Sequence, residues 1–364
     1  MMDTDMTGSV QTVLGPVSPG DLGVTLTHEH LLIDLGFFRQ PPPEASLRTR
    51  FAEPVSLSLL GLLKQTGAVN VDNGRLLDLE TAIGEAALYR RHGGGSLVDA
   101  TSVGIARDPG GLAQIARATG VNIVMGSSYY VAGAHPADMD SRTEDDIFAE
   151  IVRDVTVGVE ATGIRAGVIG EVGCSWPMTA NERRVLRASG RAQVATGSPL
   201  LVHPGRDETA PMQAMEVLAG VGADPTRIIM SHIDRTVFLR STLQQLAQTG
   251  CYLEWDLFGR EQSYYAANRA IDMPTDAQRM DDIAWISDLG YGDRVVVAHD
   301  VCSKDRMAVY GGHGYHYVLS DIAPRMRERG FTQGAIEAIL VGNPAAALTF
   351  AAPADPSPPL AKGG

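Results

Sequence analysis

Short apolar segments rich in β-branched residues alternate with longer segments of helical periodicity along most of the chain. This alternation is typical of a parallel α/β architecture, in which each strand is followed by a helix that covers the sheet. Eight strands are predicted, at residues 24–27, 96–100, 121–125, 166–169, 200–202, 227–230, 251–254 and 295–298. Eight strand–helix units fit a (β/α)8 TIM barrel better than a doubly wound sheet, because no GxGxxG sequence follows the first strand.

Three helix starts carry the sequence of a capping box, in which a threonine and a residue three positions later bond reciprocally to the first turn. The pairs are Thr143 with Asp146, Thr179 with Glu182, and Thr275 with Gln278. Apolar residues at a four-residue spacing follow the first pair over residues 147–159, which predicts an amphipathic helix there.

The connections after predicted strands 1, 7 and 8 are long and contain proline, glycine and aromatic residues. They cover residues 36–73, 259–274 and 301–317. All three leave the C-terminal ends of strands, where barrel enzymes form their pockets. We expect one domain over residues 10–351, a flexible N-terminal segment at 1–9, and a disordered proline-rich tail at 352–364.

Composition narrows the classes of function. The chain has 364 residues, and 30 Lys and Arg against 43 Asp and Glu give a net charge of −13. With no block of basic residues, a role at nucleic acid or at an anionic membrane is disfavoured. No apolar run is long enough for a membrane span, and an acidic start without signal-peptide layout predicts a soluble cytoplasmic protein. The cysteines Cys174, Cys251 and Cys302 lie too far apart for a disulfide framework or a Cys-based zinc module.

Histidines and acids occur where the predicted strands end. His28 and His30 close the first strand two residues apart, so both imidazoles face one side while Glu29 points away. Four more such residues end strands 4, 5, 6 and 8: Glu171, His203, His232 and Asp300. A single histidine at a strand end is more often a satisfied polar residue or a loop anchor. Six positions from five strands of one barrel converge, however, and imidazole with carboxylate is the ligand set of Zn, Mn, Fe or Co.

The chain resembles the phosphotriesterase family of the amidohydrolase superfamily, and within it the phosphotriesterase-related branch. The resembling stretches span most of the chain, at residues 10–16, 22–31, 167–176, 231–234, 254–259, 298–306, 310–315 and 343–345. The resemblance implies two divalent metal ions per chain, with zinc expected first and Mn, Co or Fe as alternatives.

The resemblance also implies a role for each ligand. His28, His30 and Asp300 would hold the more buried metal, whereas His203 and His232 would hold the more exposed one. Organophosphate hydrolases of this family bridge the metals with a carboxylated lysine. This chain has no lysine in that segment, and Glu171 is expected to be the bridge, as in the related branch.

A hydroxide that bridges the two metals would attack the substrate, and Asp300 would take its proton and pass it to the leaving group. Tyr130 resembles the pocket tyrosine of the family's lactonases, although a packed aromatic at the barrel rim is an equal alternative. Asp234 is expected to orient a ligand imidazole, or else to cap a loop. Among the charged residues of the long loops, Arg260 and Lys304 are the candidate substrate contacts.

We therefore expect a metal-dependent hydrolase that acts on an amide, a lactone or other ester, or a phosphoester. Amides and lactones come before phosphotriesters, because Glu171 favours the related branch and an arginine or lysine would bind an anionic group that neutral phosphotriesters lack. The alternative is a non-catalytic ligand-binding barrel with a structural metal. The expected partner is a small molecule, with no nucleic acid or membrane, and a homodimer is compatible with the sequence.

Overall fold

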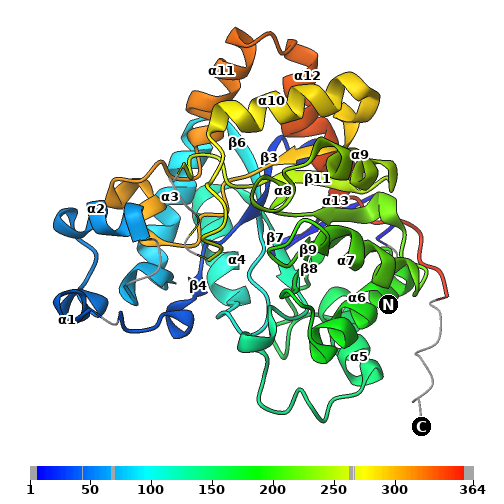
Figure 1. Ribbon diagram of the computed structural model, residues 1–364. Coiled ribbons are helices and arrows are strands. Elements are labelled where there is room, and N and C mark those ends of the chain that lie inside the picture. Colours follow the sequence, from blue (N-terminus) through cyan, green and yellow to red (C-terminus); the bar gives the residue numbers. More distant parts are fainter. Residues whose placement is uncertain (1–5, 43, 67–69, 262–264, 266, 356–364) are drawn as a thin grey trace.

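Eight parallel strands form a nearly closed barrel in the computed structural model, which describes residues 6–42, 44–66, 70–261, 265 and 267–355 (Figure 1). The strands are β3 (Val24–Glu29), β6 (Gly94–Asp99), β7 (Asn122–Ser127), β8 (Val168–Gly173), β9 (Leu200–His203), β10 (Ile228–Met230), β11 (Tyr252–Trp255) and β12 (Val295–Val297). Neighbours in the sheet follow chain order, and the N–H of Asp300 donates to the carbonyl of His28 (3.1 Å) where the two ends meet. The predicted barrel is confirmed, and each of the eight predicted segments overlaps one strand, although the fourth shares only Val168 and Ile169 with β8.

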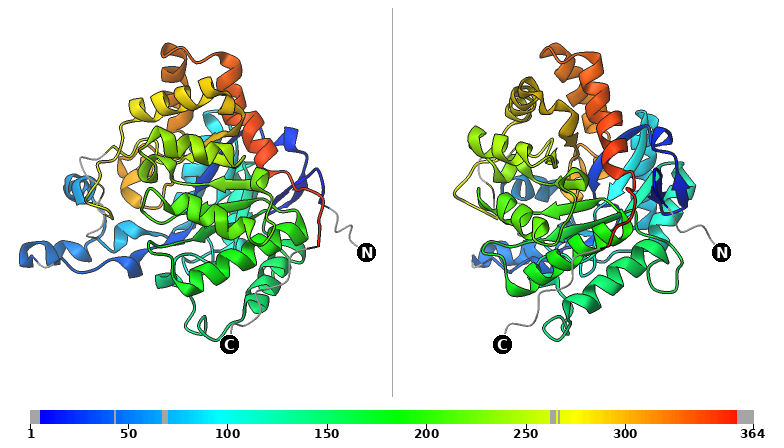
Figure 2. Two further views of the ribbon diagram at one scale, coloured as in Figure 1. Left: turned by 45° about the vertical axis from the view of Figure 1, so that its right-hand side comes forward. Right: turned by 90° about the vertical axis from the view of Figure 1, so that its right-hand side faces the viewer.

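Helices surround the strands (Figure 2). They are α3 (Leu79–Arg91), α4 (Pro109–Thr119), α5 (Glu144–Thr156), α6 (Ala180–Thr196), α7 (Ala210–Ala219), α8 (Ile233–Thr236), α9 (Arg240–Gln248), α10 (Asp276–Ile286), α11 (Ala323–Glu328), α12 (Gln333–Glu337) and α13 (Asn343–Leu348). The three predicted capping boxes are present at the starts of α5, α6 and α10. These helices therefore begin where local side-chain chemistry satisfies their free N–H groups.

The alternation of strand side chains divides the buried apolar residues of the barrel into two large clusters, and a third, smaller cluster lies in the connection after β11. One cluster fills the barrel interior and contains Val98, Val124, Val168, Leu201, Ile229 and Val296. The other contains their strand neighbours, such as Leu97 and Ile123, together with apolar residues of the outer helices. Because the interior is packed with side chains, the barrel can bind a ligand only at its mouth.

The long connections carry secondary structure of their own. The first contains α1 (Ala45–Arg48) and α2 (Leu57–Thr66), which project from the side of the barrel, and it is tied down by the pairing of β4 (Ile33–Asp34) with β5 (Arg75–Leu76) (Figures 1 and 2). The second connection falls partly on residues 262–264 and 266, which lie outside the described residues.

Both ends of the described chain pack against the barrel. A hairpin of β1 (Val10–Thr12) and β2 (Gly15–Val17), which the sequence analysis did not predict, precedes β3. The N–H of Gly8 donates to the carbonyl of Phe350 (2.9 Å). Residues 1–5 and 356–364 of the expected flexible termini lie outside the described residues. In the part of the chain that is described, no helix combines the length and apolar character needed to cross a membrane.

Candidate metal centre

The six predicted ligands meet in one buried cluster at the C-terminal end of the barrel. Nε2 of His30 lies 3.3 Å from Oδ1 of Asp300 and 3.3 Å from Oε1 of Glu171. Nε2 of His28 lies 3.6 Å from Oε2 of Glu171 and 3.9 Å from Oδ1 of Asp300. Two ligand atoms that share a tetrahedral zinc at about 2.0–2.2 Å are roughly 3.4 Å apart. The spacing of these four side chains therefore fits a metal better than it fits hydrogen bonds.

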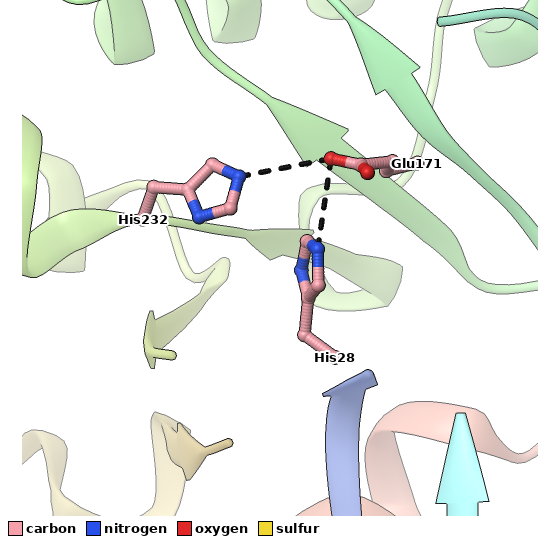
Figure 3. A group of neighbouring side chains, drawn as sticks. All are labelled: His28, Glu171 and His232. Atoms are coloured by element: carbon pink, nitrogen blue, oxygen red, sulfur yellow. Dashed lines mark ion pairs between the residues drawn. The ribbon is translucent and has the colours of Figure 1, made fainter. Parts of the chain in front are cut away.

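A second group of donors lies on the other side of Glu171. Figure 3 shows His232 and His28 approaching the same carboxylate oxygen from two directions, each with Nε2 3.6 Å away. Nδ1 of His203 is closer, at 2.6 Å from this oxygen and 2.8 Å from Nε2 of His232. Glu171 thus offers one oxygen to His30 and the other to His203, which fits the bridging role expected for it.

Two β-bulges aim the ligands into the barrel mouth. Between the residues of β8 that pair with Leu200 and Val202, the strand holds one residue more than β9 does, and Glu171 lies in this irregular stretch. An equal irregularity in β3 precedes Glu29, where His28 lies. Bulges of this kind redirect side chains beside active sites. Gly170 is required at the first one, because its φ is 138° and a Cβ would lie 2.3 Å from the carbonyl oxygen of Leu201.

Hydrogen bonds from behind select which ring nitrogen of each histidine faces the cluster. Nδ1 of His30 bonds to Oγ1 of Thr101 (2.9 Å), and Nδ1 of His28 bonds to Oε2 of Glu254 (3.2 Å). Nε2 of His28 is buried and has no hydrogen-bond partner within the described residues. A metal ion held there would satisfy this buried nitrogen, which lies beside the carboxylates of Glu171 and Asp300.

Asp256 holds the fourth histidine more tightly. One of its oxygens accepts from the backbone N–H of His232 and the other contacts Nδ1, both at 2.8 Å. His232 has a φ of 57°, a left-handed conformation that is uncommon for a residue other than glycine. The two bonds fix this conformation and leave Nε2 directed at Glu171.

Charge within the cluster keeps its members in metal-binding form. Burial raises the pKa of Glu171 and of Asp300, but the neighbouring histidines outweigh it and lower both pKa values, so the carboxylates stay ionised. Burial lowers the pKa of His203 to about 4, and burial together with Arg235 lowers the pKa of His232, so both imidazoles are neutral. Neutral imidazole and ionised carboxylate are the forms that bind metal ions.

The pKa values of the other two histidines, His28 and His30, are governed by the carboxylates beside them. Although burial lowers it, the pKa of His30 is raised to about 9 by Asp300 and Glu171, and the pKa of His28 is raised by Glu171. The two carboxylates therefore require positive charge beside them. A divalent metal would supply that charge and release the protons from the imidazoles.

The other predicted site residues lie in different surroundings. Tyr130 borders the cavity above the cluster, with its ring centroid 5.0 Å from that of His203. Arg260 borders the same cavity, whereas Lys304 does not and instead pairs with Asp72 of the first long loop at 2.6 Å. Asp234 accepts bonds from Nε of Arg279 (2.7 Å) and from a backbone N–H, and it contacts no ligand imidazole.

Several residues of the site were missed by the sequence analysis, although signals for them exist. Glu254 and Asp256 stand two residues apart at the end of predicted strand 7, the same pattern that singled out His28 and His30. Arg206 and Arg235 each follow a ligand histidine by three residues. Charged residues a few positions after each candidate ligand could therefore have been predicted to line the site.

The cluster opens into a cavity of about 310 Å³. Its lining includes four arginines from four separate segments of the chain, at positions Arg39, Arg206, Arg235 and Arg260, together with Tyr130 and Tyr265. A (β/α)8 barrel with imidazoles and carboxylates at the C-terminal ends of its strands, below such a cavity, defines the class of metal-dependent hydrolases.

Comparisons with known proteins agree with this class and narrow it. A sequence model of the phosphotriesterase family matches residues 8–348. The chain is 45% identical over 346 residues to the phosphotriesterase-related protein of Nematostella vectensis, which covers 94% of this chain and 99% of that protein. It is 42% identical over 348 residues to the N-acetyltaurine hydrolase of Bos taurus, which covers 95% and 99%. The chain therefore belongs to the phosphotriesterase family.

The same fold is found in solved structures. The resiniferatoxin-binding protein of Rhodobacter sphaeroides has a TM-score of 0.91 and 37% identity, and the alignment covers 94% of this chain and 95% of that one. The family implies a divalent metal cofactor, and the donor groups of this chain fit one.

Asp256→Asn is expected to weaken metal binding by roughly 10- to 100-fold while the protein stays folded. An amide is uncharged and has one acceptor oxygen, whereas the carboxylate of Asp256 accepts from both the backbone N–H and Nδ1 of His232. The measurement is metal content after dialysis against a graded series of chelator concentrations. Asp234→Asn is the matched control, since the side chain of Asp234 is as buried as that of Asp256 and close in sequence but bonds to Arg279. A larger loss of metal in the control would show that Asp234 orients the site after all.

Proposed function

We propose that this protein hydrolyses small N-acyl compounds that carry an anionic group some bonds away from the amide. The observation that carries this proposal is the position of the His and carboxylate cluster at the base of a cavity lined by four arginines. The cluster supplies hydrolysis, and the arginines supply recognition of the anion.

The cavity is cationic although the whole chain is acidic. None of Arg39, Arg206, Arg235 and Arg260 forms an ion pair with a carboxylate in the described part of the chain. Converging guanidinium groups repel one another in a half-buried site, and a bound anion relieves this repulsion while forming charge-assisted hydrogen bonds. A neutral phosphotriester offers no such compensation.

Two divalent ions, with zinc as the first choice, would be held by His28, His30 and Asp300 on one side of Glu171 and by His203 and His232 on the other. Metals bound there would lower the pKa of water toward neutrality and polarise the scissile carbonyl. Asp300 would accept the proton of the attacking water and return it to the leaving amine. Tyr130, whose pKa burial and Glu171 raise well above its usual value, stays protonated and would donate a hydrogen bond to the substrate.

The relatives support an amide with an anionic group. N-acetyltaurine, the substrate in the name of the Bos taurus relative, combines an amide with a sulfonate. A cytoplasmic reaction fits the three unpaired cysteines.

A substrate panel tests the proposal. Zinc-loaded protein is expected to show its highest kcat/KM with N-acetyltaurine or N-acetyl amino acids, a lower value with lactones, and the lowest with a phosphotriester such as paraoxon. Metal analysis is expected to give about two ions per chain. A phosphotriester cleaved near the diffusional ceiling of about 10⁸ M⁻¹s⁻¹, with amides orders of magnitude slower, would reverse the ranking. Metal-loaded protein that binds these compounds without turnover would favour the ligand-binding barrel instead.

A further inference from the structure

Tyr265 lies between two of the cavity arginines. Nε of Arg206 donates to the phenol oxygen of Tyr265 at 2.9 Å, and the guanidinium carbon lies 5.6 Å from the centre of the tyrosine ring. The guanidinium carbon of Arg260 lies 5.3 Å from the same centre. Tyr265 is only 4% exposed, and all three side chains line the cavity above the metal cluster. One aromatic side chain thus contacts two cations that come from the loops after β9 and β11.

The two arginines keep N–H groups available. In the described part of the chain, the Nη groups of Arg206 and the guanidinium of Arg260 form no hydrogen bond. Arg235 differs, because its Nη groups contact Thr236, Pro204 and, at 3.1 Å, Nε2 of His203. Arg235 therefore supports a metal ligand, whereas Arg206 and Arg260 can turn their donors toward a substrate.

The electrostatics around Tyr265 show how strongly positive this wall is. Burial alone raises the pKa of a tyrosine, yet Arg206, Arg235 and Arg260 lower the pKa of Tyr265 below its usual value. On the wall formed by the first long loop, Arg39 adds a buried Nε without a hydrogen-bond partner among the described residues. The natural occupant of the space between these groups is an anion.

We propose that Tyr265 positions Arg206 and Arg260 as a clamp for the anionic end of the substrate, and that Arg206 determines the preference for anionic over neutral amides. This inference rests on the proposed function and specifies how that site selects its substrate. Arg206 contacts the anion directly, whereas Tyr265 acts through the two arginines. The clamp accepts a sulfonate or a carboxylate, since both present several oxygens to guanidinium donors.

Three amides of matched length distinguish the effect of the anionic group from that of the rest of the substrate. They are N-acetyltaurine, N-acetyl-β-alanine and the neutral N-propylacetamide. For Arg206→Gln, KM for the two anionic amides is expected to rise roughly 10- to 150-fold, the range for one lost hydrogen bond to a charged group, with kcat nearly unchanged. The kcat/KM for the neutral amide should stay the same. The larger KM increase among the two anions shows whether sulfonate or carboxylate is the better fit.

Further variants distinguish positioning from general damage. Arg206→Lys keeps the charge and should fall between wild type and Arg206→Gln. Tyr265→Phe removes the acceptor for Nε of Arg206, so it should raise KM for the anions only, and its effect should largely disappear in the double variant with Arg206→Gln. Arg117→Gln, an exposed change on α4, is the control. Equal losses on anionic and neutral amides in Arg206→Gln, or an unchanged KM for the anions, would overturn the clamp.

A binding measurement keeps this test separate from amide hydrolysis. Titration of ethanesulfonate into zinc-loaded protein should give a Kd that Arg206→Gln weakens by a similar factor. If wild type cleaves no amide but this difference in Kd remains, the proposed function is wrong and the clamp stands. If wild type cleaves amides but ethanesulfonate binds both proteins equally, the clamp is wrong and the hydrolase stands.

Discussion

Glu171→Gln is expected to lose most of the hydrolytic activity and at least one metal ion. The substitution keeps the volume of the side chain but removes the charge that faces both groups of histidines. Breaking a buried ionic arrangement by removing one partner costs about 3–5 kcal/mol. If that cost falls on the metals, affinity drops by roughly two to four orders of magnitude. Metal content after gel filtration and kcat for the best amide substrate are the measurements.

Glu182→Gln is the matched control, because Glu182 is a fully buried glutamate that bonds to the start of α6 and not to the cluster. Its loss should lower thermal stability and leave the metal content intact. Glu171→Gln protein that kept both metals and full activity would show that the bridge lies elsewhere.

The convergence of the six candidate ligands could be predicted from the sequence, because in a parallel barrel the position of a residue along its strand decides where it lies in space. A residue at the C-terminal end of any strand reaches the same mouth, so strand assignment alone brings His203, His232 and Asp300 together. No long-range pairing had to be guessed. The prediction that His28 and His30 face the same side rested on strict alternation of side chains along the strand. In the structure, β3 has a register shift before Glu29, and no sequence pattern predicts it.

The side chains behind and above the ligands were harder to predict, because their roles depend on loop paths. The fold turns Asp234 toward Arg279 of α10, and the neighbouring strand brings Asp256 under His232 instead. Lys304 was a reasonable candidate by position, but the first long loop supplies Asp72 to pair with it. Which of several loop charges reaches a cavity is decided by such contacts between loops, and these have no periodic signature.

The proton acceptor in catalysis can be narrowed down among the groups around the cavity. Tyr130 stays protonated and so cannot take up a proton, and under the proposed function the four histidines would be engaged as metal ligands. Glu171 has both oxygens directed at imidazoles. Asp300 contacts histidines through Oδ1 and is the more exposed of the two carboxylates, at 9% against 2%. Under the proposed function, its second oxygen would exchange a proton with water or substrate.

Asp300→Asn is accordingly expected to reduce kcat by roughly 10²- to 10⁴-fold, the usual contribution of a positioned acid or base, while metal content falls far less. The variant should fold, because asparagine tolerates the φ of 51° at this position and the backbone bonds to His28 and Arg306 remain. The amide oxygen can still coordinate a metal but cannot hold the proton of the attacking water. Equal losses in metal and kcat would make Asp300 a ligand only.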